Sequence, residues 1–125
     1  MIAKQGRTVP NLATEDLIHC GRLTLRPRIG RAYWDGTDVC LTLAEFKIVQ
    51  LLASNAGSFM TYRQIYDCMR HVGFVAGSGT EGYRTNVRST MRRIRNKFKA
   101  QCAHFNEIRT YTSFGYCWKA VQERG

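Results

Sequence analysis

The chain has 125 residues, 44% of them hydrophobic, which suits one domain with its own core but not two substantial ones. Its 19 lysines and arginines face 9 acidic residues, and the net charge of +10 predicts attraction to a polyanion, nucleic acid first and an acidic membrane second. No apolar run approaches the roughly 18 residues of a membrane span, and residues 1–10 lack the apolar core of a signal peptide. We therefore expect a cytoplasmic protein that does not insert into membranes.

The five cysteines are scattered along the chain and include no C-x-x-C pair, so we expect reduced, mostly packed thiols. Two short clusters, His19–Cys20 and Cys102–His104, lack the closely spaced ligand pairs of a zinc site. No cysteine lies within a nucleophile motif. The sequence therefore predicts no metal site, no cofactor and no enzymatic activity.

The order of elements follows from periodicity and turn signals. We expect residues 1–16 to be a flexible tail or linker remnant, residues 17–120 to form one domain, and residues 121–125 to be a C-terminal tail. Between residues 17 and 41, short runs alternate apolar and polar residues around turn signals that include the hairpin dipeptide Asp35-Gly36. They predict a small antiparallel sheet with strands at Leu17–Cys20, Leu23–Leu25, Ala32–Trp34 and Val39–Leu41.

Helical spacing replaces this alternation after residue 41. A capping-box signature at Thr42–Glu45 opens a helix that Asn55–Gly57 ends, and a second signature at Thr61–Gln64 opens a shorter one. A glycine-rich loop, Gly73–Gly82, then separates it from a long helix at Tyr83–Lys99.

Two final runs, Ile108–Tyr111 and Gly115–Trp118, flank a turn and predict a terminal β-hairpin. Tyr116 and Trp118 share one face of this hairpin, which we interpret as a core face rather than as a platform for single-stranded bases. The sequence therefore predicts an α+β fold with its elements in the order sheet, three helices, hairpin.

The long helix has the most informative pattern. Its apolar face carries Tyr83, Val87, Thr90, Met91, Ile94 and Phe98 at helical spacing. The other faces hold seven basic residues and no acidic one: Arg84, Arg88, Arg92, Arg93, Arg95, Lys97 and Lys99. Like charges this close repel one another, and a polyanion across the face would offset that cost.

A helix of this length fits the B-DNA major groove, which is about 12 Å wide, whereas the deep groove of duplex RNA does not admit it. Arginines predominate, and their planar forks can bind guanine in a bidentate manner or bind a phosphate. Other readings remain open: a solvated face, a lipid-binding helix, a protein-interaction module for an acidic partner, or an RNA-binding domain that uses the aromatic residues Tyr111, Phe114, Tyr116 and Trp118.

Four segments together resemble the OmpR/PhoB family of response-regulator effector domains. Leu41–Phe46 is similar to that family's L-T-x-x-E-F, and Ala56–Ile65 to its P-G-x-V-x-S-R-x-x-L. Thr85–Phe98 resembles the end of its recognition helix, I-x-R-L-R-x-K-L, and Ile108–Tyr116 its hairpin signature, I-x-T-x-x-G-x-G-Y. The resemblance covers residues 21–118 and implies a winged helix-turn-helix domain of a bacterial, cytoplasmic two-component transcription regulator.

The resemblance also implies roles for particular residues. It makes Arg93 a base-contacting arginine with Ser89, Thr90 and Arg92 beside it, and Arg95 and Thr110 contacts to the DNA backbone. We expect Arg88 to face the groove as well, and Arg84, Lys97 and Lys99 to lie on phosphates. The candidate DNA-binding residues are Arg84, Arg88, Ser89, Thr90, Arg92, Arg93, Arg95, Asn96, Lys97, Arg109, Thr110 and Thr112.

The chain departs from the family pattern at the hairpin, where Thr112 replaces a frequent arginine and Ser113 a frequent glycine. We expect Arg109 to substitute for the missing arginine. The loop that follows the second helix corresponds to a segment that touches RNA polymerase in several family members, which makes Arg70, His71 and Phe74 a candidate polymerase-facing group. The resemblance further implies a homodimer on direct-repeat half-sites.

Overall fold

The computed structural model describes residues 16–70 and 82–120. Strands β2 (Ile18–Cys20), β3 (Leu23–Arg26), β4 (Arg31–Trp34) and β5 (Thr37–Asp38) form an antiparallel sheet in chain order. The β4–β5 turn places Asp35 at φ 50° and Gly36 at φ 85°, as a two-residue hairpin turn of type I′ requires. The expected tails, and His71 and Phe74 of the glycine-rich loop, lie outside the described residues.

The expected strand at Val39–Leu41 is wrong, because β5 ends at Asp38. The Val39 amide still donates to the Ala32 carbonyl, but Cys40 adopts φ 64° and its amide turns to the Asp38 carboxylate. A left-handed residue cannot continue an extended strand. The chain instead turns into the first helix.

Three helices follow: α1 (Leu43–Ser54), α2 (Tyr62–Arg70) and α3 (Gly82–Gln101). Both capping boxes are confirmed. The Glu45 amide donates to the Thr42 hydroxyl and the Thr42 amide to the Glu45 carboxylate, and Thr61 and Gln64 exchange the same two bonds before α2. None of the helices in the described ranges is long and apolar enough to span a bilayer.

The terminal hairpin, β7 (Ile108–Tyr111) and β8 (Gly115–Trp118), is confirmed, and it gains a third strand that the sequence did not predict. This strand, β6 (Phe59–Thr61), precedes α2 and pairs with β8, so the sheet order is β6-β8-β7. Position 115 must be glycine because a Cβ there would collide with the Met60 carbonyl on β6.

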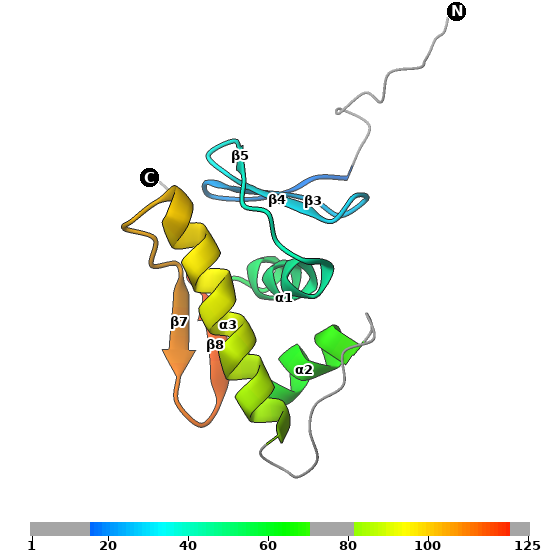
Figure 1. Cartoon of the computed structure of the whole chain (residues 1–125), viewed down its shortest axis with the longest axis vertical. Coiled ribbons are helices and arrows are strands. Elements are labelled where there is room, and N and C mark those ends of the chain that lie inside the picture. Colours follow the sequence, from blue (N-terminus) through cyan, green and yellow to red (C-terminus); the bar gives the residue numbers. More distant parts are fainter. Residues whose placement is uncertain (1–15, 71–81, 121–125) are drawn as a thin grey trace, which may run out of the picture.

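One aromatic cluster joins the two sheets and α3. Phe98 of α3 stacks on Phe105 at 4.6 Å between ring centroids, and Trp34 and Trp118 meet both rings edge-on. In Figure 1, α1 lies below the N-terminal sheet and α3 runs alongside the hairpin. The core therefore holds α3 by one side and leaves the other facing outward, which is the winged-helix arrangement expected from the sequence.

Candidate nucleic-acid interface

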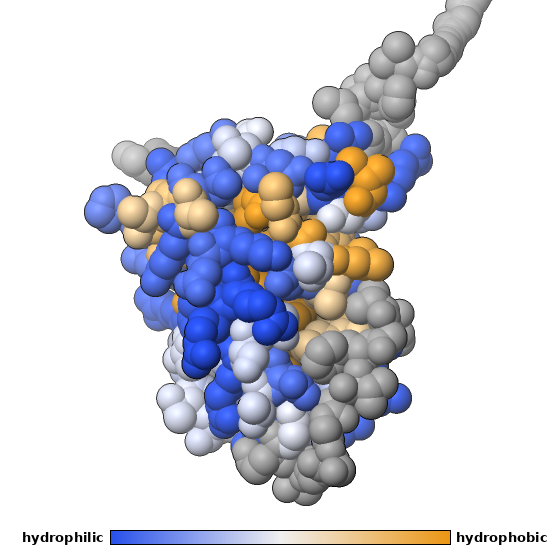
Figure 2. All heavy atoms as spheres, viewed as in Figure 1, coloured by the Kyte–Doolittle hydropathy of each residue, from blue (hydrophilic) through white to orange (hydrophobic). Residues whose placement is uncertain are grey.

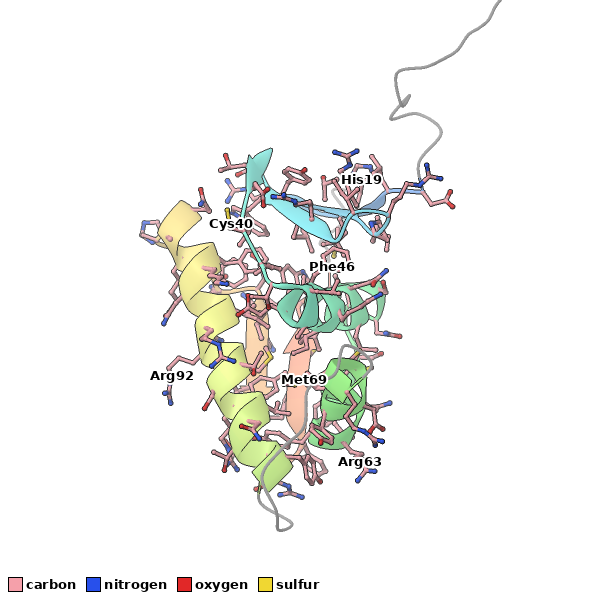
Figure 3. All side chains as sticks on the ribbon, turned by 45° about the vertical axis from the view of Figure 1, so that its right-hand side comes forward. His19, Cys40, Phe46, Arg63, Met69 and Arg92 are labelled. Atoms are coloured by element: carbon pink, nitrogen blue, oxygen red, sulfur yellow. The ribbon has the colours of Figure 1, made fainter. Side chains whose placement is uncertain are left out.

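The two faces of α3 differ as the helical spacing predicted. Val87, Met91, Ile94 and Phe98 are completely buried. The opposite face exposes Arg88, Arg92, Arg93, Asn96 and Lys99. Figure 2 shows hydrophilic side chains over most of the visible surface of this helix, and the labelled Arg92 in Figure 3 points away from the body of the protein.

A buried tyrosine supports two arginines of the first half of α3. The guanidinium carbons of Arg84 and Arg88 lie 5.6 Å and 5.4 Å from the centroid of the Tyr62 ring, which is itself 3% exposed. Cation–π contacts of this kind restrict a long side chain without neutralising its charge. Sequence analysis assigned no role to Tyr62, which no spacing rule would have placed under an arginine of another helix.

Arg95 joins α3 to the hairpin. Its Nη2 donates to the Ile108 carbonyl at 2.9 Å and to the Thr110 hydroxyl at 2.6 Å, and its guanidinium lies 5.6 Å from the centroid of the Tyr116 ring. Burial and the neighbouring Tyr62 raise the pKa of Tyr116 to about 12, so its phenol stays neutral. The two residues expected to contact the DNA backbone, Arg95 and Thr110, are thus brought into contact with each other.

A buried carboxylate lies beneath the middle of α3. Glu45 of α1 places Oε1 2.6 Å from Lys97 Nζ and Oε2 3.7 Å from Arg93 Nε, and its side chain is 3% exposed. Burial by itself would raise the pKa of Glu45, but the hydrogen bonds from Lys97 and Thr42 outweigh burial and hold the pKa below its ordinary value. The carboxylate is therefore ionised at neutral pH.

Helix capping is the only role that the sequence indicates for Glu45, and its two ion pairs were not predicted. They join residues 48 and 52 positions apart, which helical periodicity within one segment cannot connect. The available signal was indirect, since a cluster of basic residues without an acid on its own helix can recruit one from a neighbouring element.

Thr90 was expected both on the apolar face and among the DNA contacts, and the structure supports only the first. It is 1% exposed, and its hydroxyl accepts a hydrogen bond from Arg93 Nη2 at 3.0 Å. Thr90 is therefore a buried residue of α3, and its expected contact with DNA stays a prediction that this burial does not favour.

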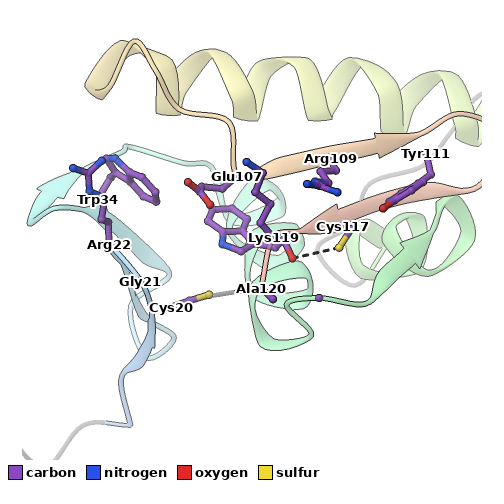
Figure 4. Close-up of a pocket in the computed structure, with 12 residues that line it drawn as sticks. Cys20, Gly21, Arg22, Trp34, Glu107, Arg109, Tyr111, Cys117, Lys119 and Ala120 are labelled. Carbon is purple, nitrogen blue, oxygen red and sulfur yellow. Dashed lines mark hydrogen bonds between the residues drawn. The ribbon is translucent and has the colours of Figure 1, made fainter. Parts of the chain in front are cut away.

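The hairpin divides its residues between two faces. Side chains of successive strand residues point to opposite sides, so Thr110 meets α3 whereas Arg109 and Tyr111 line a groove of about 630 Å³ that faces away from it. Figure 4 shows this groove between the hairpin and the turn that carries Arg22. The structure does not bring Arg109 to the basic surface of α3, while Thr112 is exposed in the hairpin turn.

The aromatic residues of the hairpin also divide into two groups, one buried and one exposed. Tyr116 and Trp118 are buried, which confirms their interpretation as core residues. Tyr111 and Phe114 are exposed, and their rings lie 4.7 Å and 5.5 Å from the ring of Phe59 on β6. Both rings contact Phe59 and do not form an open row of stacking platforms.

Residues 36–118 match the family model described as transcriptional regulatory protein, C terminal. The chain belongs to this family. This match and the relative described next confirm the resemblance to response-regulator effector domains. A curated relative, regulatory protein VanRB of Enterococcus faecalis, is 32% identical over 96 residues, which are 77% of this chain and 39% of that protein.

Solved effector-domain structures share the fold. The DNA-binding domain of CpxR from E. coli has a TM-score of 0.67 at 19% identity, over 85% of this chain and 98% of that one. The Klebsiella pneumoniae RstA DNA-binding domain, solved in complex with the RstA box, has a TM-score of 0.65 at 24% identity, over 83% of this chain and 97% of that one. The family match covers residues 36–118 of the 125-residue chain, and the chain spans about two fifths of the length of VanRB.

Proposed function

We propose that this effector domain recognises one duplex DNA sequence with α3 in the major groove, as the output domain of a two-component regulator. The observation that carries the proposal is the exposed face of a 20-residue helix that holds Arg88, Arg92, Arg93 and Lys99 without any acidic residue, while the other face is packed into the core. Such a helix is about 30 Å long, enough to lie along a major groove about 12 Å wide.

The exposed residues divide into two groups. Arg92, Arg93 and Asn96 lie on the outermost face and, with Ser89 and Arg88, are suited to base edges. Arg92 has no hydrogen bond or ion pair with another residue of the described part of the chain, and its fork is available in full. Arg84 and Arg95 are half-buried at the margins of the face, and the exposed Lys99 lies in the last turn of α3, where phosphates would pass.

Thr110 and Thr112 extend this surface onto the hairpin, where a backbone contact fits their small polar side chains. Two copies on a direct repeat would place their α3 helices about one DNA turn apart. A polymerase contact near the end of α2 remains a prediction. Of its proposed residues, Arg70 is described and exposed, and it lies 3.7 Å from Asp67.

The test is selection of bound duplexes from a random pool, followed by competition between the enriched duplex and a scrambled one at physiological salt. We expect a preference of at least about 10³-fold, as is typical of specific DNA-binding domains. If about five phosphates are neutralised, the slope of log affinity against log salt should be near −4 to −5. Binding without preference, or tighter binding of single-stranded RNA or an acidic protein segment, would overturn the proposal.

Matched variants assign the roles. Arg93→Ala should relax discrimination at one base pair by about 5- to 150-fold, the range that one bidentate contact supplies. Lys99→Ala should weaken binding to all sequences alike. Arg28→Ala changes the charge equally in the turn after β3 and should alter neither quantity.

A further inference from the structure

The carboxylate of Glu45 is unusual in its position. It belongs to the first turn of α1, yet it lies under α3 and is one of only two buried polar or charged residues in the described part of the chain, the other being Thr90. Both of these buried polar groups contact the same side chain, Arg93. Their convergence on one arginine is the observation to explain.

Arg93 is held along one edge. A guanidinium has five N–H donors. Glu45 lies 3.7 Å from Nε, and the Thr90 hydroxyl accepts from Nη2 at 3.0 Å. The Nη1 donors and one Nη2 donor remain, on a side chain that is 56% exposed. The outer edge of the fork is therefore left for a ligand, while the inner edge makes one hydrogen bond, to Thr90, and one ion pair, to Glu45.

Glu45 is itself fixed in turn. Its second oxygen, Oε1, accepts hydrogen bonds from the Thr42 amide at 2.8 Å and from Lys97 at 2.6 Å. A carboxylate with this many partners has one available orientation, so it can orient the arginine that pairs with it. The three charges of Glu45, Arg93 and Lys97 sum to +1, which still favours an approaching polyanion.

We infer that Glu45 is a positioning residue for sequence discrimination, which together with Thr90 presents the outer edge of the Arg93 guanidinium to the DNA bases. The inference rests on the proposed function, because it assumes that Arg93 reads a base. A fork that is oriented before binding loses less conformational entropy on contact, and a mobile fork can settle on other bases or on phosphates.

Glu45→Gln is the discriminating variant. Glutamine keeps an acceptor for the Thr42 amide but removes the charge that holds Arg93. We expect the ratio of affinities for the selected duplex and for a duplex changed at the Arg93-dependent base pair to fall about tenfold, within the range of one bidentate contact. Affinity for scrambled duplex should stay equal or rise, because a negative charge near the phosphates is lost.

A double-mutant cycle separates positioning from general structural damage. In an Arg93→Ala background, Glu45→Gln should leave the discrimination ratio unchanged, because the side chain that it positions is gone. Gln64→Ala is the matched control, since it removes the corresponding cap of α2 without touching α3, and it should leave the ratio as in the parent.

Substitutions of Thr90 provide a second test of the inference, which does not depend on how well the Glu45→Gln variant folds. Thr90→Val keeps the buried shape and removes the hydroxyl, so the discrimination ratio should fall, whereas Thr90→Ser should retain it. Suppose that the parent domain discriminates between the two duplexes and that Arg93→Ala does not. The inference is then overturned if both Glu45→Gln and Thr90→Val keep the parental ratio of affinities. It is also overturned if Glu45→Gln lowers the ratio equally with and without Arg93. Absence of discrimination by the parent would instead refute the proposed function.

Discussion

Lys97 provides the sharpest test of the structure, because its expected role changed. Sequence analysis placed it on a phosphate, but the structure pairs its amine with Glu45 at 2.6 Å and leaves 34% of its side chain exposed, against 3% for Glu45. In Lys97→Ala the buried carboxylate would retain only the Thr42 hydrogen bonds and the longer contact to Arg93. We therefore predict a loss of folding stability in addition to weaker DNA binding.

The magnitude follows from these contacts. Breaking a fully buried pair costs about 3–5 kcal/mol because an uncompensated charge remains. Here Lys97 is one third exposed and Arg93 remains near the carboxylate, so solvent and the second cation reduce the cost to about 1–3 kcal/mol. Lys99 is exposed and has no acidic partner among the described residues, so Lys99→Ala should stay within about 0.5 kcal/mol of the parent.

Urea unfolding monitored by circular dichroism at pH 7 gives the free energy of unfolding of both variants. Equal dependence of that free energy on urea concentration verifies that the two variants unfold in the same transition as the parent. Combining Lys97→Ala with Glu45→Gln should recover part of the loss, since no charge is then left unpaired. Equal stabilities of Lys97→Ala and Lys99→Ala would refute the buried ion pair and with it the fixed orientation of Glu45.

Three further predictions concern the hairpin and pH. Ser113 adopts φ 75°, so Ser113→Gly should relieve left-handed backbone strain and raise the free energy of unfolding by up to about 1 kcal/mol in urea. Gly115→Ala should lower it by more than about 2 kcal/mol, because the new Cβ meets the Met60 carbonyl and two strands must separate; a neutral result in the same assay would contradict the β6–β8 pairing. The pKa of Glu45 is lowered by Lys97 and Thr42, so these contacts stabilise the fold above the unfolded value of about 4.5 and lose this contribution as pH falls through the folded value. A stability profile from pH 7 to pH 3 should accordingly be flatter for Glu45→Gln, and identical profiles would count against the pairing.

Local signals in the sequence predicted most of the fold. The capping boxes at Thr42 and Thr61, the Asp35-Gly36 turn and the periodicity of α3 each depend on residues a few positions apart, and all were confirmed. The strand expected at Val39–Leu41 failed because alternation of apolar residues does not report a single residue at positive φ, here Cys40. Strand β6 is only three residues long and is defined by pairing with β8, which lies more than 50 residues away.

The candidate site was predicted in part. Helical periodicity was sufficient to divide α3 into a buried and an exposed face. It could not place the groups that support the exposed arginines, since Tyr62 and Glu45 come from other helices and meet α3 only after packing. Periodicity placed Thr90 on the apolar face whereas the family resemblance placed it beside the base-contacting arginine, and the structure buries its side chain.

The central claim is that the exposed face of α3 lies in the major groove. Dimethyl sulfate protection tests it most directly, because the reagent methylates guanine N7 in the major groove and adenine N3 in the minor groove. On the selected duplex we predict protection of guanine N7 over one stretch of major groove, with one protected guanine becoming reactive in Arg93→Ala. Protection confined to adenine N3, or guanine N7 that stays fully reactive in a saturated complex, would contradict the claim.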